Sequence, residues 1–151
     1  MGEKIKNLKQ LKKKLIHIIT KAIVENVIED IKDLHIEKIE KHVYKVYKPK
    51  KYSRRKDNGG LTDKKNMKTE IIKNANSVEL KFSNVTKSNP KNLPEGYTSE
   101  KIAGNIEYGK RYHYMKMKPR PFIAKTRKSL KKGEFKKMLK KALIIRGFIL
   151  K

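Results

Sequence analysis

The chain has 151 residues, which is enough for one domain with a modest hydrophobic core. Hydrophobic residues make up 36% and charged residues 37% of it, and a formal net charge of +26 points first to a polyanionic neighbour or partner. Without cysteine, neither a disulfide scaffold nor a thiolate metal site is available, and no apolar run approaches the roughly 20 residues of a membrane span.

One long amphipathic helix is predicted from Glu3 to about His42, because no Gly or Pro interrupts this stretch. At 1.5 Å per residue it is roughly 60 Å long, whereas a compact domain of this size has a radius of gyration near 15 Å. We therefore expect a break near Thr20 or Asn26, or packing against a neighbouring subunit. Its apolar residues recur at spacings of three and four: Ile5, Leu8, Leu11, Leu15, Ile18, Ala22, Ile23, Val27, Ile31 and Leu34.

Charge divides this predicted helix into two halves. Residues 3–21 have a net charge of +6, whereas residues 22–42 have a net charge of −3. Such halves predict a head-to-tail contact between copies of the chain, with a basic half against an acidic half. The alternative is a solvated helix, in which charges four residues apart, such as Glu37 and Lys41, pair along one face.

Tyrosines alternate with lysines and arginines in the segment that follows the helix, from Tyr44 to Arg55. Pro49 and the run Asp57–Gly60 are typical of loops, so an exposed loop is expected near residues 45–66. A second exposed loop is expected near residues 86–98, which contain two prolines and a glycine but no apolar periodicity.

Two strands are predicted between these loops, over Met67–Lys73 and Ser77–Val85. Apolar and polar residues alternate in the second strand, which is the pattern of a half-buried strand. The short Asn74–Asn76 segment favours a hairpin turn, so the two strands should pair in an antiparallel sheet.

The sequence around residue 110 contains two predicted helix boundaries. Gly109 suits the position just after a helix end, where the backbone is left-handed, so a helix is expected over Glu100–Tyr108. Thr98 and Ser99 are its candidate N-caps. Pro121 suits the first turn of the next helix, because its missing N–H needs no partner there.

Two more helices are expected near the C-terminus, over Phe122–Lys131 and Glu134–Arg146, with Gly133 between them. The segment Phe148–Leu150 is a candidate edge strand. The second helix has an apolar face formed by Phe135, Met138, Leu139, Ala142 and Leu143.

Phe122 is the first large apolar residue of its helix, so we expect it to be buried against the sheet or the long helix. Arg120 precedes it by two residues and should point elsewhere. Its expected partner is an acid such as Glu107 or an acid of an adjacent subunit, and the alternative is an exposed arginine.

No arrangement of nucleophile, base and orienting group is apparent, so we expect no enzyme activity and no cofactor. The four histidines are His17, His35, His42 and His113. Although His35 and His42 lie seven residues apart on one helix face, no carboxylate cluster accompanies them, and a metal role is not expected.

Four short motifs occur in a fixed order along the chain: Tyr-x-x-Tyr-x-Pro-x-x-Tyr-x-Arg-Arg at 44–55, Gly-Gly-Leu at 59–61, Ile-Glu-Tyr-Gly at 106–109 and Arg-Pro-Phe at 120–122. In this order they resemble the minor tail component family of long-tailed bacteriophages, whose members join head to tail or terminate the tail tube. The resemblance implies a single α+β domain over residues 1–151, with a long N-terminal helix packed on a small antiparallel sheet and additional C-terminal helices.

The resemblance also implies partners and a location. Copies of such proteins form a ring, typically of six, between the head connector or stopper protein and the tail tube protein, and the phage DNA passes through the channel. The virion neck or the top of the tail is the implied location, after assembly in the host bacterial cytoplasm. The residues expected at contacts with a neighbouring subunit or protein are Tyr47, Tyr52, Arg54, Arg55, Glu107, Tyr108, Arg111, Tyr112, Arg120 and Phe122.

A competing interpretation is a basic protein that binds nucleic acid without sequence preference. Residues 110–151 have a net charge of +15, and the tyrosines at 44–55 are interleaved with cations. A nucleic-acid-binding protein should bind DNA in a salt-sensitive way as a monomer or dimer, whereas a neck protein should form rings. A basic helix could also lie on an anionic membrane, but its apolar face is needed for the core, so no membrane partner is expected.

Overall fold

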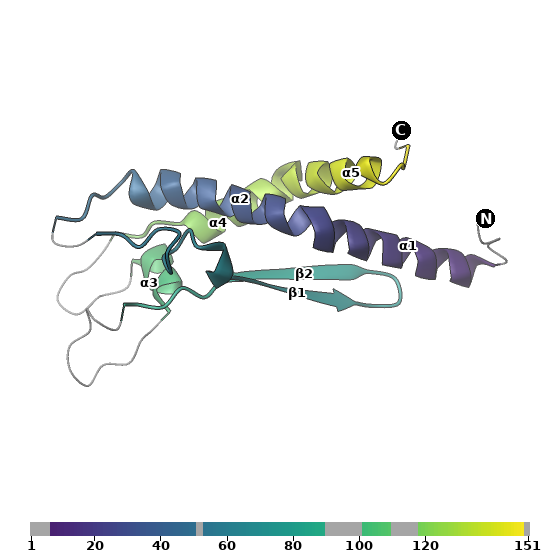
Figure 1. Cartoon of the computed structure of the whole chain (residues 1–151), viewed down its shortest axis with the longest axis horizontal. Coiled ribbons are helices and arrows are strands. Elements are labelled where there is room, and N and C mark those ends of the chain that lie inside the picture. Colours follow the sequence, from purple (N-terminus) through teal and green to yellow (C-terminus); the bar gives the residue numbers. More distant parts are fainter. Residues whose placement is uncertain (1–6, 51–52, 90–100, 110–117, 150–151) are drawn as a thin grey trace.

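The computed structural model describes residues 7–50, 53–89, 101–109 and 118–149. It confirms the predicted α+β fold, with a long N-terminal helix, a two-stranded antiparallel sheet and additional helices towards the C-terminus (Figure 1). None of the described helices is both long and apolar enough to cross a membrane.

The N-terminal helix is continuous from Leu8 to Tyr44. It consists of α1 (Leu8–Ala22), the π-helical turn η1 (Ile23–Val27), α2 (Ile28–Ile39) and a second π-helical turn, η2 (Glu40–Tyr44). The expected break is therefore replaced by a widening of the helix, which keeps the axis continuous and a length of about 55 Å.

Most of this helix is covered by its own chain, contrary to the expectation that it would outrun the domain. The prediction assumed a compact globule, but the molecule is elongated, and the hairpin and the C-terminal helices run alongside the helix (Figure 1). Only the first turns of α1 project beyond this cover. There Leu8, Leu11 and Leu15 are 65%, 36% and 43% exposed.

The predicted hairpin is confirmed, with strands β1 (Met67–Lys73) and β2 (Val78–Asn84). The strands pair antiparallel in a register that places Met67 opposite Asn84. The turn closes through a 2.8 Å hydrogen bond from the Asn74 N–H to the Ser77 carbonyl. Apolar side chains on one face of the hairpin pack against the helices, which explains the alternation of the sequence.

The helix before Gly109 is α3 (Ile102–Tyr108), which starts two residues later than predicted. Its N-cap is Lys101, whose side chain makes no capping hydrogen bond. The two candidate caps, Thr98 and Ser99, lie outside the described residues. Gly109 has φ = 64° and ends α3 in the left-handed conformation, as predicted.

The C-terminal helices follow the predicted pattern, as α4 (Phe122–Ser129), the π-helical turn η5 (Leu130–Glu134) and α5 (Phe135–Ile145). Gly133 has φ = 119°, a conformation that other residues rarely adopt, and it forms the kink between α4 and α5. The predicted apolar face of α5 packs on the core around α1 and η1.

The expected edge strand at Phe148–Leu150 is wrong over its described part, because Phe148 and Ile149 are not in a strand. The chain instead turns after α5, where Gly147 has a positive φ and the Phe148 N–H donates to the Leu143 carbonyl at 3.2 Å. This is a helix-capping turn, which satisfies free carbonyls at the end of α5 instead of extending the backbone.

Arg146 fixes α5 on the π-helical turn η1. Its Nη1 donates to Asn26 Oδ1 at 2.6 Å and to the Ala142 carbonyl at 2.9 Å. Its Nη2 bonds to the Glu25 carboxylate and to the Lys21 carbonyl. One side chain therefore ties the last described helix to the middle of the first.

The core consists of two apolar clusters along the long helix. The first lies around η2 and contains Ile39, Val43, Tyr44, Leu61, Met67, Ala103 and Phe122. The second lies around η1 and contains Ala22, Ile23, Val27, Ile31 and Ala142. Both segments that were predicted as exposed loops contribute buried residues, namely Gly60–Thr62 and, in the second segment, Thr86 and Ser88.

Candidate functional site

Two sequence motifs that are distant in the chain meet at the C-terminal end of the long helix. The Arg54 guanidinium lies 4.6 Å from the ring centroid of Tyr44 and 5.8 Å from that of Tyr47. The Arg120 guanidinium lies 4.9 Å from the Tyr47 ring. Tyr47 is 37% exposed, so its ring is held by two cations while part of it stays accessible to a partner.

Tyr44 and Arg54 form the inner part of this tyrosine–arginine cluster. Arg54 Nη1 donates to the Tyr44 carbonyl at 3.1 Å, and its Nη2 is buried without a hydrogen-bond partner among the described residues. Tyr44 is buried, and this burial raises the pKa of its phenol. The inner pair therefore supports the cluster, whereas Tyr47 and Arg120 form its outer surface.

Glu107 of the Ile-Glu-Tyr-Gly motif caps helix α4. It is buried, and its two carboxylate oxygens accept the backbone N–H groups of Ile123 at 2.8 Å and Ala124 at 2.9 Å. These donors belong to the first turn of α4, where they have no partner within the helix and where the helix dipole favours a negative charge. The expected Glu107–Arg120 pair is thus corrected: the backbone of α4 is the partner of Glu107, and the Tyr47 ring is the partner of Arg120.

Pro121 is the N-cap of α4, with φ = −79° and ψ = 60°, and not a residue of its first turn as expected. Its carbonyl accepts the Lys125 N–H at 3.0 Å, which is the first hydrogen bond of the helix. Phe122 follows it and is 0% exposed, within the core cluster around η2. Its ring lies 5.3 Å from that of His35, so the expected burial against the long helix is observed.

The remaining predicted contact residues are only partly described. Arg55 Nη2 donates to the Lys87 carbonyl at 2.5 Å, and Tyr108 is 70% exposed. Three others, Tyr52, Arg111 and Tyr112, lie outside the described residues. Because Glu107 and Phe122 are buried within the chain, they stabilise the elements that carry the surface residues. For the remaining residues of the predicted set, contact with a neighbouring subunit or protein stays a prediction.

The Gly-Gly-Leu motif has a structural explanation. A Cβ at Gly60 would lie 2.3 Å from the Lys56 carbonyl oxygen, so no larger residue fits there without a shift of the backbone. The Gly60 carbonyl accepts a hydrogen bond from Asn66 Nδ2 at 3.0 Å, and Thr86 Oγ1 lies 3.2 Å from it. The next residue, Leu61, is buried in the core, so this turn anchors the loop to the domain.

Sequence reasoning missed a buried polar network around His35. His35 Nδ1 lies 2.9 Å from Thr126 Oγ1, and its Nε2 lies 3.5 Å from Asn84 Nδ2. Asn84 Nδ2 also donates to the Leu61 carbonyl, and Thr86 Oγ1 donates to Asn84 Oδ1. One signal was available: His35 is flanked by Ile31 and Ile39 at spacings of four on the buried face of α2.

His35 is neutral inside this network. The Thr126 hydroxyl donates to the Phe122 carbonyl at 2.8 Å, so its oxygen accepts the proton on His35 Nδ1. Burial lowers the pKa of His35 from 6.5 to about 4. The role of His35 is thus to connect α2, α4 and β2. Among the described residues, no group of three or more His, Asp or Glu side chains is placed to hold a metal ion.

The buried neutral ring predicts a loss of stability in mild acid. The unfolded chain takes up a proton on His35 as the pH falls below 6.5, whereas the folded chain does so only near pH 4. Between pH 7 and pH 5 the free energy of unfolding should therefore fall by about 2 kcal/mol. Urea denaturation at a series of pH values measures this change. His35→Gln should abolish most of this pH dependence, whereas His17→Gln, at an exposed site, should leave it intact. If the unfolding free energy of His35→Gln changes with pH as much as that of the wild type, groups other than His35 cause the change.

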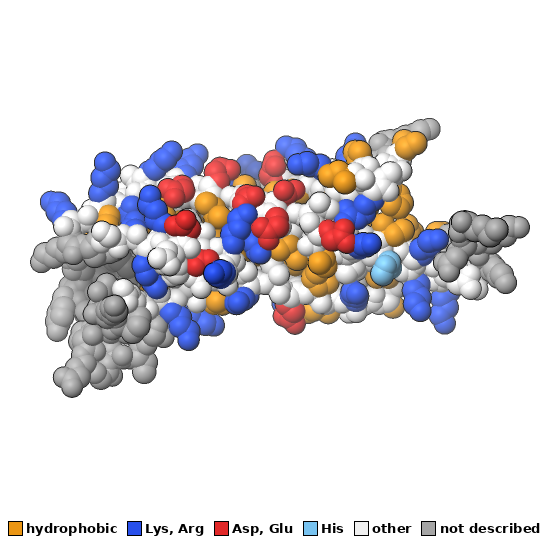
Figure 2. Space-filling model, in the orientation of Figure 1, with side chains coloured by type: hydrophobic (Ala, Val, Ile, Leu, Met, Phe, Trp, Pro, Cys, Tyr) orange, Lys and Arg blue, Asp and Glu red, His pale blue; other side chains and the backbone are white. Residues whose placement is uncertain are grey.

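An acidic strip lies on α2 and contrasts with the basic remainder of the chain. Six of the 15 acidic residues occur between Glu25 and Glu40, a segment with a net charge of −4. Figure 2 shows acidic side chains gathered in the middle of the visible face, with lysines around them. Lys64 bonds to Glu29 at 3.1 Å and to Asp33 at 2.6 Å, and hydrogen bonds from Lys32 and then Lys64 lower the pKa of Glu29.

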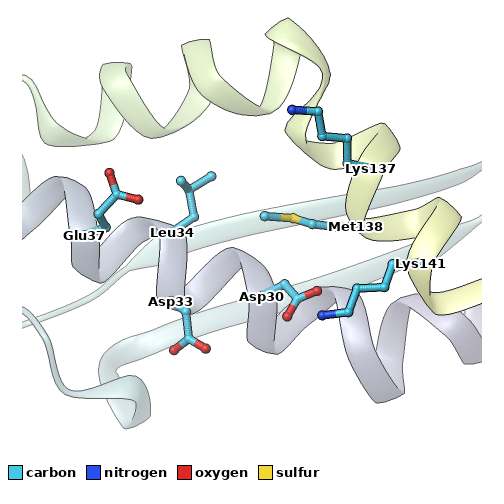
Figure 3. Close-up of a pocket in the computed structure, with 7 residues that line it drawn as sticks. All are labelled: Asp30, Asp33, Leu34, Glu37, Lys137, Met138 and Lys141. Carbon is cyan, nitrogen blue, oxygen red and sulfur yellow. The ribbon is translucent and has the colours of Figure 1, made fainter. Parts of the chain in front are cut away.

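An open groove of about 420 Å³ runs between α2 and α5, beside this strip (Figure 3). Asp30, Asp33 and Glu37 of α2 form one wall, and Lys137 and Lys141 of α5 belong to the other. The side chains of Leu34 and Met138 point into the space between the helices. The groove combines apolar surface with carboxylates, which is a chemistry that suits a basic amphipathic partner.

Comparison with known protein families gives a match over most of the chain. A protein-family model described as YomN matches residues 7–144 of the chain, which include every described helix and strand except the last residue of α5. No curated protein and no solved structure matches.

Proposed function

The chain belongs to the YomN family, whose name derives from a Bacillus phage region. Because this name indicates a phage-related origin, we propose that the chain is a structural protein of a phage virion. In this proposal, copies of the chain form a ring of six at the neck of a tailed phage or of a phage-tail-like particle. The ring terminates the tail tube and joins it to the head connector, with a channel for the DNA. It assembles in the cytoplasm of the host bacterium and has no catalytic role, cofactor or membrane partner.

The observation that supports this role best is the convergence of the motifs at one end of the molecule. The tyrosine–arginine cluster joins Tyr47 and Arg54 to Arg120, and Glu107 caps the helix that follows Arg120. Tyrosine and arginine are enriched at protein interfaces, where desolvation strengthens a cation–π contact. A partner that covers the exposed part of Tyr47 would complete such a contact.

A deletion in the phage or prophage tests the proposal. Particles made without the chain should contain separate heads and tails in electron micrographs, and the wild-type chain supplied in trans should restore joined particles. Arg120→Ala should fold normally but fail to restore them, because Tyr47 loses its outer cation. Arg127→Ala, an exposed arginine of α4, is the matched control and should restore them. Joined, infectious particles formed without the chain would rule out this role.

A second candidate function, nucleic-acid binding, is favoured by the lysines exposed along η5 and α5. They are accompanied by a single acid, Glu134, and comprise Lys131, Lys132, Lys136, Lys137, Lys140 and Lys141. If six of them contacted phosphates, the affinity for a DNA duplex would fall about a thousandfold between 50 and 200 mM salt. Fluorescence anisotropy of a labelled DNA duplex measures this dependence of the affinity on salt concentration. Tight binding of DNA by a monomer at physiological salt would favour this second function over the neck role.

A further inference from the structure

The first turns of α1 present an apolar stripe that no described part of the chain covers. Leu8, Leu11 and Leu15 lie on one face of the helix, because they are spaced by three and four residues. Lys12 lies beside the stripe, four residues after Leu8 and three before Leu15. An exposed apolar stripe at the tip of a helix is typical of a contact surface.

The charge of α1 defines the chemistry of the surface that would cover it. Its sequence contains five lysines and no acid, and Lys9, Lys12 and Lys13 have no ion pair within the described part of the chain. A complementary surface must therefore offer carboxylates beside an apolar floor.

The α2–α5 groove of another copy has this composition. Leu34 and Met138 supply the apolar floor, and the three carboxylates of the α2 wall, Asp30, Asp33 and Glu37, outnumber the two lysines of the α5 wall, Lys137 and Lys141. Asp30 has neither a hydrogen bond nor an ion pair with any described residue. It is therefore available to a lysine from outside the chain.

A chain cannot place its own α1 in its own groove. α1 and α2 belong to one continuous helix, so the distance between them along the axis is fixed. Leu11 and Asp33 are 22 residues apart, which corresponds to about 33 Å. Contact between the two surfaces is consequently possible only between copies.

We propose that the Leu8–Leu15 face of α1 docks in the α2–α5 groove of a second copy. The three leucines lie on Leu34 and Met138, and the α1 lysines face the acidic wall of the groove. Each copy offers one tip and one groove, and in the proposed arrangement the contact is heterologous and repeats from copy to copy. This proposed contact depends on the proposed function in one respect only, namely that repeated contacts close into a ring.

Charge reversal tests the contact in the full-length chain. Sedimentation velocity at tens of micromolar and low ionic strength should show self-association of the wild type, which weakens as salt is added. Lys9→Glu with Lys12→Glu should weaken the association about tenfold or more, and Asp30→Lys with Glu37→Lys should do the same. The variant with all four changes should associate again, because the two surfaces are complementary with exchanged signs.

Two control variants change the net charge by the same amounts at other exposed sites. Glu70→Lys with Glu79→Lys, on the hairpin, matches the groove reversal, and Lys128→Glu with Lys132→Glu matches the α1 reversal. Both controls should associate within about twofold of the wild type if the contact is specific. A strictly monomeric wild type, equal effects in the control variants, or a fourfold variant no better than either reversal would overturn the inference.

The outcome for the contact is separable from that for the virion role. If self-association responds to the charge reversals as predicted, but joined particles still form without the chain, the neck role is refuted and the contact stands. Joined particles that depend on the chain but tolerate both reversals would refute the contact and leave the neck role standing.

Discussion

The Phe122→Ala variant is expected to lose about 3–5 kcal/mol of unfolding free energy, the usual cost of truncating a buried phenylalanine. Phe122 is fully buried among the residues that join α4 to η2, α3 and β1, and its ring contacts that of His35. A domain possesses about 5–15 kcal/mol in total, so the melting temperature should fall sharply. Urea and thermal denaturation followed by circular dichroism measure both quantities.

Tyr108→Ala is the matched control, because it removes an aromatic side chain of similar size from an exposed position. Its free energy of unfolding should stay within about 0.5 kcal/mol of the wild type. Phe122→Leu keeps most of the buried volume and should cost far less than Phe122→Ala. Equal melting temperatures of Phe122→Ala and Tyr108→Ala would show that α4 is docked through another face.

Glu107→Ala should cost about 1–3 kcal/mol, because it removes the acceptor of two part-buried backbone N–H groups in the first turn of α4. The carboxylate holds the Ile123 and Ala124 amides and thereby attaches the end of α3 to the start of α4. Hydrogen exchange followed by NMR should show faster exchange of these two amides than of the amides later in α4.

The charge and the shape of this cap are tested separately. Glu107→Gln keeps an oxygen acceptor but loses the negative charge that the N-terminus of α4 favours, so its cost should be intermediate. Glu79→Ala, at an exposed carboxylate of the hairpin, should have little effect. Unchanged protection of the Ile123 and Ala124 amides in Glu107→Ala would mean that the cap contributes nothing to α4.

The local elements were predictable because their signals are local. Apolar spacing of three and four predicted the long helix, and alternation predicted the hairpin almost to the residue. Gly109 and Gly133 marked helix ends because only glycine adopts their backbone conformations readily. In each case the physical cause lies within a few residues of the element.

The candidate site was predicted only in part. Its motifs singled out Tyr47, Arg54 and Arg120, and the structure brings these three together. The partner of Glu107 was wrong, because a carboxylate suits both a guanidinium and the N-terminus of a helix. Only the position of the α4 backbone relative to α3 decided between them.

Burial by distant parts of the chain was decided by the tertiary structure alone. The sequence by itself determined the approximate extent and the charge division of the N-terminal helix, because these follow from residue type and spacing, but it left open a break near Thr20 or Asn26. It did not determine that an elongated domain covers most of this helix and leaves the tip of α1 bare. His35 shows the reason: its partner Thr126 is 91 residues away, so whether its ring is buried and neutral depends on how α4 packs against α2.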